Sequence, residues 1–324
     1  MPNYQGVWSL STQFQNAGDW PKALPASIGL FYAGYKTSIS TKIEYIDLTT
    51  SGNTTDFGDM LTTVRLTVAG FGSTTRGGVG GGYTSASANT NVVQYVTFST
   101  LGDASDFGDL TVARSYISGA SNNTRGIFAG GWDGTDSNVI DYITIATTGN
   151  ASDFGDTTAA KSMPSALASS TRAVINGGYS FGSTSYYNVM EYITIGSTGN
   201  GTDFGDLATA IYATDSAASS TRGLIIGGDN HTQSPRYKDT IQYITIASTG
   251  NATDFGDLSY ARAFGAATSS NTLAVYGGGT GATGYVNSIE QMTIASTGNA
   301  TDFGDLSTEH GQFAASSNCH GGIA

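Results

Sequence analysis

The 324-residue chain has few cysteines, prolines and charged residues, and it contains no long apolar run. Its lone cysteine, Cys319, cannot form an internal disulfide, so we expect the core alone to hold the fold together. Thirteen Lys and Arg stand against 25 Asp and Glu, which gives a net charge of −12. This balance argues against a nucleic-acid partner, because phosphate binding needs clustered basic side chains. Since no run of 18 apolar residues occurs, we expect no membrane insertion.

Glycine, serine and threonine are abundant instead. The chain has 45 glycines but only five prolines, and strong helix formers are too few for a helical protein. This composition is typical of many short strands joined by tight turns. It predicts an all-β protein.

The triplet Asp-Phe-Gly recurs six times, beginning at Asp56, Asp106, Asp153, Asp203, Asp254 and Asp302, with spacings of 50, 47, 50, 51 and 48 residues. Protein kinases hold magnesium with this triplet, but no HRD-type catalytic loop or strand lysine accompanies any copy here. A catalytic residue is needed once, whereas a structural corner is needed in every repeat. We therefore expect each Phe to be a buried plug, each flanking Asp to accept backbone N–H bonds, and no metal or cofactor to be bound.

Each unit contains four short segments with strand-like alternation. In the last full unit they read RAFGAATSS, NTLAVYGGG, NSIEQMTIAST and GNATDFGDL. The first segment has small residues that suit a crowded axis. The third carries a tyrosine in five of the six units, at Tyr45, Tyr95, Tyr142, Tyr192 and Tyr243. The second ends in a glycine pair that favours positive φ, at Gly81-Gly82, Gly130-Gly131, Gly177-Gly178, Gly227-Gly228 and Gly277-Gly278.

The two ends of the repeat region complement each other. The first unit starts at its second strand, residues 29–34, and lacks the usual small-residue inner strand. The segment 311–317 near the C-terminus supplies such a strand. Residues 26–324 are therefore predicted to form a single six-bladed β-propeller with four strands per blade, closed by a C-terminal strand in the first blade. The placement of the residues that follow, from Cys319 to Ala324, stays open.

These features resemble the kelch repeat family over nearly the whole chain. The double glycine, the downstream tyrosine and a basic residue before the inner strand carry the resemblance, the last at Arg65, Arg114, Lys161 and Arg262. The chain departs from kelch proteins in having no repeat tryptophan. Its near-verbatim STGNATDFGDL units are similar to those of kelch-like proteins from tailed, especially marine, bacteriophages. That resemblance implies a virion or tail component, assembled in the host cytoplasm, whose partners include other virion subunits. Particle symmetry could make it an oligomer, but the sequence leaves the oligomeric state open.

A second set of basic residues opens the second strand, at Arg76, Arg125, Arg172 and Arg222. A ring of arginines could bind an anionic ligand. We favour pairing with corner aspartates such as Asp109 or Asp206, because bidentate Arg–carboxylate geometry suits a repeated corner.

Function on a repeat scaffold must come from what differs between the units. The variable parts are the loops between the second and third strands, which should all emerge on one face. They carry eight aromatic residues, at Tyr35, Tyr83, Trp132, Tyr179, Tyr186, Tyr187, Tyr237 and Tyr285. The fifth loop adds His231 and Arg236, which suit an acidic glycan or protein patch. Aromatic loops are typical of binding surfaces, although some of these rings would instead pack over the rim.

The resulting hypothesis is a non-enzymatic virion protein, located in the tail, a fibre-associated module or the capsid surface. Its loop face would bind a host-surface glycan or receptor, or another protein. The alternative is an intracellular kelch-type adaptor. An enzyme would need acid residues on an inner strand, where Asp215 is the only clear candidate, and one carboxylate does not make the pair that glycoside cleavage requires.

Residues 1–25 precede the repeats. A short helix is predicted over residues 11–17, because Gly18 and Pro21 follow it. Trp8, Phe14 and Trp20 give this extension more apolar surface than a tail without binding partners would need. We expect it to pack under the first blade or, preferably, to anchor the protein to a neighbouring subunit.

Overall fold

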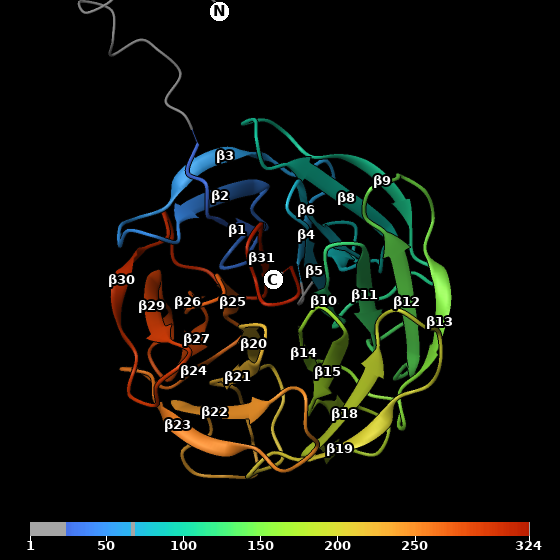
Figure 1. Cartoon of the computed structure of the whole chain (residues 1–324), viewed down its shortest axis with the longest axis vertical. Coiled ribbons are helices and arrows are strands. Elements are labelled where there is room, and N and C mark those ends of the chain that lie inside the picture. Colours follow the sequence, from blue (N-terminus) through green and yellow to red (C-terminus); the bar gives the residue numbers. More distant parts are fainter. Residues whose placement is uncertain (1–23, 66–68, 324) are drawn as a thin grey trace, which may run out of the picture.

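The computed structural model describes residues 24–65 and 69–323. Within these ranges the chain is all β, with 31 strands and no helix. Twenty-four strands form six four-stranded antiparallel sheets, which are arranged around a common axis as in a β-propeller (Figure 1). The predicted helix over residues 11–17 and the predicted anchors Trp8, Phe14 and Trp20 lie outside the described residues.

The same four strand positions occur in every sheet. The innermost strands are β5 (Ala69–Gly72), β10 (Ser118–Ser121), β14 (Ser165–Ala168), β20 (Asp215–Ala218), β25 (Ala266–Ser269) and β31 (Ala314–Ser317). The second strands are β1 (Ile28–Tyr32), β6 (Arg76–Gly80), β11 (Arg125–Ala129), β15 (Arg172–Asn176), β21 (Arg222–Ile226) and β26 (Leu273–Gly277). The third strands are β2 (Lys42–Asp47), β8 (Val92–Thr97), β12 (Val139–Thr144), β18 (Val189–Thr194), β22 (Thr240–Thr245) and β29 (Ser288–Thr293). The outermost strands are β3 (Thr55–Asp59), β9 (Ser105–Asp109), β13 (Ser152–Asp156), β19 (Thr202–Asp206), β23 (Thr253–Asp257) and β30 (Thr301–Asp305).

The remaining strands form short ribbons. They are β4 (Val64–Arg65) with β7 (Tyr83–Thr84), β16 (Tyr179–Ser180) with β17 (Ser185–Tyr186), and β24 (Arg262–Ala263) with β27 (Thr280–Gly281) and β28 (Gly284–Tyr285). These ribbons lie before the inner strands or in the loops after the second strands. They therefore order part of the region in which function was predicted.

One sheet is built from both ends of the repeat region. Strand β31 pairs antiparallel with β1, with Gly29 opposite Ser317 and Tyr32 opposite Ala314. The Tyr32 and Ser316 hydroxyls lie 2.8 Å apart in the same pair of strands. The C-terminal segment thus supplies the inner strand that the first unit lacks.

The core lies between neighbouring sheets. One cluster joins Phe154 and Ile140 of one sheet to Ala173 and Ile193 of the next, and five similar clusters join the other neighbouring sheets. The Phe of every Asp-Phe-Gly triplet is almost fully buried, as predicted, at Phe57, Phe107, Phe154, Phe204, Phe255 and Phe303. Each of the five third-strand tyrosines lies edge-on to the triplet Phe of its own sheet.

The prediction for the triplet aspartates is wrong. Within the described ranges, no backbone N–H donates to their side chains. Instead, the backbone N–H of Asp156 donates to Oδ1 of Asn200 in the next sheet, at 3.0 Å, and Gly199 N–H donates to the Phe154 carbonyl, at 2.8 Å. A Cβ on Gly155 would lie 2.5 Å from the Gly199 carbonyl oxygen. The Asp-Phe-Gly segment of one sheet therefore binds the Gly-Asn segment of the next sheet through backbone and Asn hydrogen bonds.

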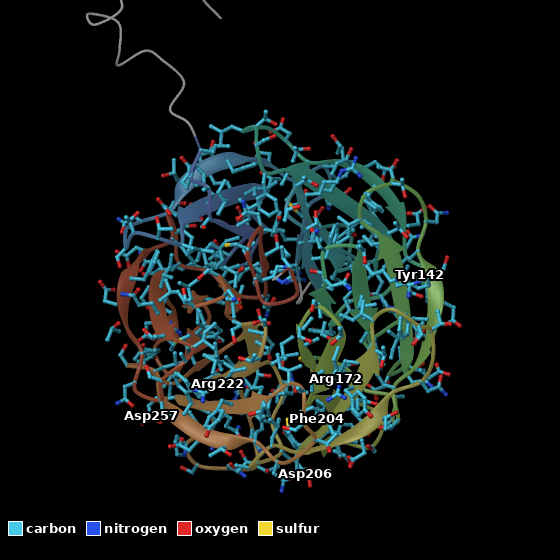
Figure 2. All side chains as sticks on the ribbon, in the orientation of Figure 1. Tyr142, Arg172, Phe204, Asp206, Arg222 and Asp257 are labelled. Atoms are coloured by element: carbon cyan, nitrogen blue, oxygen red, sulfur yellow. The ribbon has the colours of Figure 1, made fainter. Side chains whose placement is uncertain are left out.

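The expected pairing of the second-strand arginines with corner aspartates is also wrong. Nη1 of Arg172 donates to the Ile246 carbonyl of the next sheet, at 2.8 Å, and its guanidinium lies 4.1 Å from the centre of the Tyr192 ring. Arg76, Arg125 and Arg222 repeat this arrangement. Figure 2 shows Asp206 and Asp257 near the outer rim, with Arg172 and Arg222 closer to the axis. The arginines thus serve packing between the sheets.

The glycine pairs have positive φ, as expected, with one correction of register. Gly130 and Gly131 have φ of 67° and 111°. In the last unit the pair with positive φ is Gly278-Gly279, because Gly277 still belongs to strand β26.

The residues after β31 lie among the inner strands, where Figure 1 shows the C-terminal end near the axis. Gly321 N–H donates to the Ala218 carbonyl of β20, at 2.9 Å. Nε2 of His320 lies 3.1 Å from the Gly72 carbonyl of β5. This tail therefore bridges inner strands from opposite sides of the ring of sheets, a placement that the sequence left open.

Candidate binding face

The loops between the second and third strands leave the sheets on the same side as the segments that precede the inner strands. Antiparallel pairing dictates this arrangement, since each inner strand runs away from that face and each second strand returns to it. We call this side the loop face. Its eight predicted aromatic residues are all partly buried rather than fully exposed: Tyr35, Tyr83, Trp132, Tyr179, Tyr186, Tyr187, Tyr237 and Tyr285.

Aromatic rings from different loops meet on this face. Phe181, which is 39% exposed, lies 5.0 Å from Trp132 and 5.1 Å from Tyr179 between ring centres. Tyr179 continues the chain of contacts to Tyr186, at 5.0 Å, and to Tyr212, at 5.5 Å. The rings thus form a connected surface across neighbouring sheets.

Arg236 and His231 of the fifth loop lie beside a buried carboxylate. Asp229 is fully buried and accepts hydrogen bonds from Nε and Nη2 of Arg236, at 2.9 and 2.7 Å, and from the Tyr212 hydroxyl, at 3.0 Å. His231 Nδ1 lies 2.8 Å from that hydroxyl. The hydrogen bond to Asp229 raises the pKa of Arg236 further above its ordinary value, and burial raises the pKa of Tyr212. Arg236 therefore already has an acidic partner within the protein.

Backbone hydrogen bonds connect the segments that precede five of the inner strands. Met163 N–H donates to the Tyr116 carbonyl, Ala213 to Met163, Phe264 to Ala213, and Gln312 to Phe264, at 2.8–3.2 Å. All five residues have φ between 52° and 61°, which is uncommon for residues other than glycine. This repeated conformation and its hydrogen bonds join Tyr116 and its counterparts from one sheet to the next on the loop face.

The basic residues that precede the inner strands show one exception. Arg114, Lys161 and Arg262 each lie four residues before an inner strand and form a buried ion pair with the acid at the third position of a third strand, namely Asp141, Glu191 and Glu290. Arg65 has the same position, but the third residue of β8 is the uncharged Gln94. The Gln94 side chain bonds to the backbone of Thr62 instead.

Arg65 instead lies against aromatic rings. Its guanidinium carbon lies 4.6 Å from the centre of the Tyr35 ring and 5.6 Å from that of Tyr83, which is also its cross-strand neighbour. Among the described residues it forms no ion pair, and its Nε has no hydrogen-bond partner. Burial raises the pKa of Tyr116, while the nearby Arg65 charge acts in the opposite direction.

A pocket of about 510 Å³ opens beside this arginine. Its lining residues come from three neighbouring units: Arg65, Tyr83, Ser115, Tyr116, Trp132 and Phe181. Ser115 is buried, and its hydroxyl has no hydrogen-bond partner in the described part of the chain. The corresponding Ser162 donates to Asp136 at 2.9 Å. The pocket thus has aromatic walls and one cation that forms no ion pair with any described residue, while the Ser115 hydroxyl is shielded from solvent.

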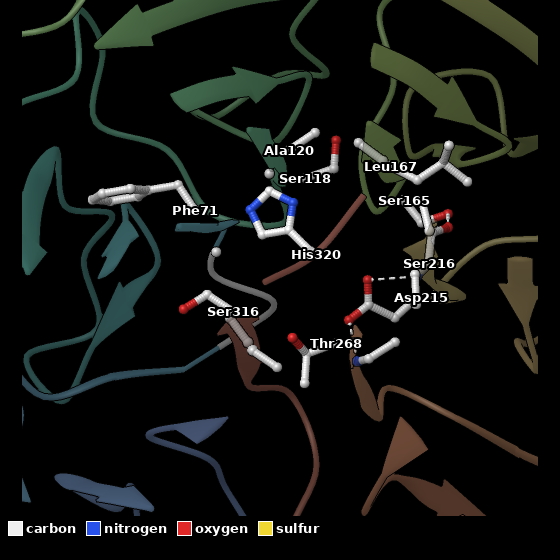
Figure 3. Close-up of a pocket in the computed structure, with 18 of the residues that line it drawn as sticks. Phe71, Ser118, Ala120, Ser165, Leu167, Asp215, Ser216, Thr268, Ser316 and His320 are labelled. Atoms are coloured by element: carbon white, nitrogen blue, oxygen red, sulfur yellow. Dashed lines mark hydrogen bonds between the residues drawn. The ribbon is translucent and has the colours of Figure 1, made fainter. Parts of the chain in front are cut away.

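The central channel is much smaller and is lined by the inner strands (Figure 3). It encloses about 90 Å³, and Asp215 is the only acidic residue among those that line it. Asp215 accepts hydrogen bonds from the backbone N–H groups of Ala267 and Ser216, both at 2.8 Å, while burial raises its pKa to about 7. His320 also lines the channel, and burial lowers its pKa to about 4.

Within residues 24–65 and 69–323, no group of three or more His, Cys, Asp or Glu side chains is placed to hold a metal ion. No helix in the same ranges has the length and apolarity needed to cross a membrane.

Several residues of this face were missed by the sequence interpretation. Phe181 lies in a loop already singled out, while Tyr116 and Tyr212 precede inner strands, outside the variable loops. Arg65 was noted only as a member of the basic series. The sequence did contain a signal that separates Arg65 from Arg114. Gln94 stands in the unit of Arg65 at the position where the unit of Arg114 has the acid Asp141.

No protein-family model matches the chain, and a search of curated proteins finds no match.

Proposed function

We propose that the six sheets are the blades of one six-bladed, kelch-like β-propeller, closed by the pairing of β31 with β1. The contacts between the first and last sheets support this closure because they repeat those between the other neighbours. Phe31 of the first sheet shares a core cluster with Phe303 of the last, and Asp305 N–H donates to Asn53 Oδ1 at 3.0 Å. An experimental map with any other number of radial sheets would contradict the proposal.

We further propose that this propeller is a non-enzymatic binding module. The observation that carries the proposal is the connected aromatic surface on the loop face, with a pocket of about 510 Å³ beside Arg65. That volume falls within the usual range for sites that bind small ligands, and partly buried aromatic side chains offer a large contact area at low entropic cost. The repeated corners and arginines, in contrast, are occupied by packing between the sheets.

The channel offers less support for an enzyme. Asp215 has the raised pKa that is common at catalytic sites, but it faces a space of about 90 Å³, too small for a sugar ring with its substituents. It also has no second carboxylate beside it among the lining residues, and glycoside hydrolysis commonly uses two.

The biological role that we propose is that of a bacteriophage virion component, on the tail, a fibre or the capsid surface, that binds a host-surface glycan or protein. The resemblance of the STGNATDFGDL units to those of phage kelch-like proteins supports this role, as does the contrast between uniform scaffold and varied loops. Mass spectrometry of purified particles of the encoding phage should recover the protein in stoichiometric amounts. Its absence from the particles would contradict the virion role.

Binding by the loop face is tested separately with recombinant full-length protein on a glycan array and on host cells. Trp132→Ala and Tyr179→Ala should reduce binding, because both rings belong to the connected surface. Leu101→Ala is the matched control, since this exposed apolar residue lies in a turn after the third strand, on the opposite face. Equal losses for all three variants would argue against a specific loop face.

An intracellular adaptor is the alternative role, because kelch domains often hold peptides. Recovery of one host protein in pull-downs, lost in Trp132→Ala and not accompanied by particle association, would favour it.

A further inference from the structure

The pocket beside Arg65 differs from its counterparts by two substitutions that act together. The third-strand acid is replaced by Gln94, which leaves the Arg65 charge without a partner in the described part of the chain. The position of Asp136, which binds Ser162, is occupied in the preceding unit by Asn89, and Ser115 is left without a hydrogen bond. Both residues line the same pocket, although the Ser115 hydroxyl is shielded from solvent and only Arg65 can meet a ligand there.

Such groups indicate a ligand because burying an unpaired polar group costs free energy. An unsatisfied hydroxyl or a partly desolvated cation destabilises the folded protein unless something pairs with it. The Arg65 guanidinium presents a planar fork of N–H donors that matches carboxylate and sulfate oxygens. The tyrosine rings near it add attraction for the cation but supply no negative charge.

The remaining walls suit a sugar ring. Tyr83, Tyr116, Trp132 and Phe181 supply aromatic rings on which the C–H face of a pyranose can stack, and the Tyr hydroxyls can bond to its hydroxyl groups. An acidic peptide would bring several charges, whereas the pocket holds a single uncompensated cation. Arg236, the cation predicted for the fifth loop, does not line this pocket and is already paired with Asp229.

We propose that this pocket binds an anionic sugar residue of a glycan, with its carboxylate or sulfate on Arg65 and its ring against Trp132 and Phe181. This inference rests on the proposed glycan-binding function and specifies its ligand class and its contacts.

The test uses the full-length protein and saturation-transfer NMR with calorimetry. The probes are the methyl glycosides of N-acetylneuraminic acid and glucuronic acid, N-acetylglucosamine 6-sulfate, neutral methyl glucoside, and the methyl ester of each carboxylated sugar. An acidic sugar should bind at least about tenfold more tightly than its own ester, because a charge-assisted hydrogen bond contributes more than about 1.4 kcal/mol. The carboxylated and sulfated probes distinguish the two sources of charge.

Variants locate the site. Arg65→Gln should weaken binding of the acidic probes by at least about tenfold, while Arg65→Lys should retain part of it. Lys36→Gln is the matched control, because it removes the same charge from an exposed position on the loop face and should change affinity less than about twofold. Trp132→Ala should weaken acidic and neutral probes alike. Thermal unfolding verifies that each variant is folded, and the comparison of acid with ester needs no variant.

Equal affinity for acid and ester, or an Arg65→Gln variant that binds like the wild type, would overturn the inference. Preference for an acidic peptide over every saccharide would overturn it too. If arrays instead show neutral glycans whose binding depends on Trp132 and not on Arg65, the proposed binding function stands and only the anionic ligand class fails.

Discussion

The carboxyl group of Asp215 should make the stability of the protein depend on pH in a predictable direction. Asp215 begins inner strand β20, accepts two backbone hydrogen bonds and lines the central channel. Burial raises its pKa from 3.8 to about 7. In the folded protein the group therefore keeps its proton over a range of pH in which the unfolded chain has released it.

The sign and size of the effect follow from this difference. Between pH 4 and 7 the folded state binds more protons than the unfolded state, so the free energy of unfolding falls as the pH rises. With these two pKa values, the contribution of Asp215 falls by about 2–3 kcal/mol from pH 5 to pH 8. Because the side chain keeps partial access to the water-sized space in the channel, this value is an upper limit.

The perturbation is Asp215→Asn, which resembles the protonated acid in shape and carries no charge. Urea unfolding at pH 5 and pH 8 measures the free energy of unfolding of both proteins. The variant loses one acceptor for the two backbone N–H groups, but that loss is the same at both pH values and cancels in the comparison. We expect the variant to gain up to about 2–3 kcal/mol relative to the wild type between pH 5 and pH 8.

Asp254→Asn is the control, because this aspartate is exposed and its side chain has no hydrogen-bond partner in the described ranges. It removes one carboxylate without altering the channel and so measures the background effect of losing a negative charge. A gap between Asp215→Asn and the wild type that stays constant within about 0.5 kcal/mol across the two pH values would refute the reasoning, since that is about the accuracy of such comparisons.

Three further predictions concern the contacts that hold the sheets together. His320, whose pKa burial lowers to about 4, should destabilise the folded wild type by up to about 3 kcal/mol as the pH falls from 6.5 to 4, and His320→Gln should lose this dependence in urea titrations. Phe204→Ala should lower the free energy of unfolding by about 3–5 kcal/mol, because it empties a buried position between two sheets. A loss below about 1 kcal/mol in chemical unfolding would contradict the packing role of the triplet Phe. Arg172→Lys keeps the charge but loses the planar contact with Tyr192 and the geometry of the hydrogen bond to the Ile246 carbonyl. We therefore expect the free energy of unfolding to fall by about 1–2 kcal/mol in the same assay. No measurable change would mean that only the charge matters.

The repeat pattern predicted much of the scaffold because each unit meets nearly the same environment. Segments of alternating residues in the unit after Arg262 correspond to strands β25, β26, β29 and β30, and Phe303 is buried as expected. The glycine pair at residues 278–279 was misplaced by one residue, because three successive glycines conceal which of them belongs to the strand.

The partners of repeated polar residues were less predictable. The pattern shows that Arg172 and Asp206 recur, but it does not say which atoms of the next unit they face. The arginine bonds to a carbonyl of the following sheet, and the aspartate contributes its backbone N–H rather than its carboxylate. Backbone groups carry no signal in the residue pattern, so local sequence favoured an Arg–Asp pair that the geometry does not make.

The amino-acid sequence by itself determined the all-β character, the repeated four-strand unit, the buried triplet Phe and the loops in which the units differ. These properties depend on the alternation of apolar and polar residues and on turn-forming residues, both of which are local features of the sequence. Only the tertiary structure decided that the C-terminal tail enters the channel, that Asp229 holds Arg236, and that Arg65 faces a pocket formed by three units. Those outcomes depend on which distant segments of the chain meet. Close packing between the sheets decides which segments meet, and no single residue does so alone.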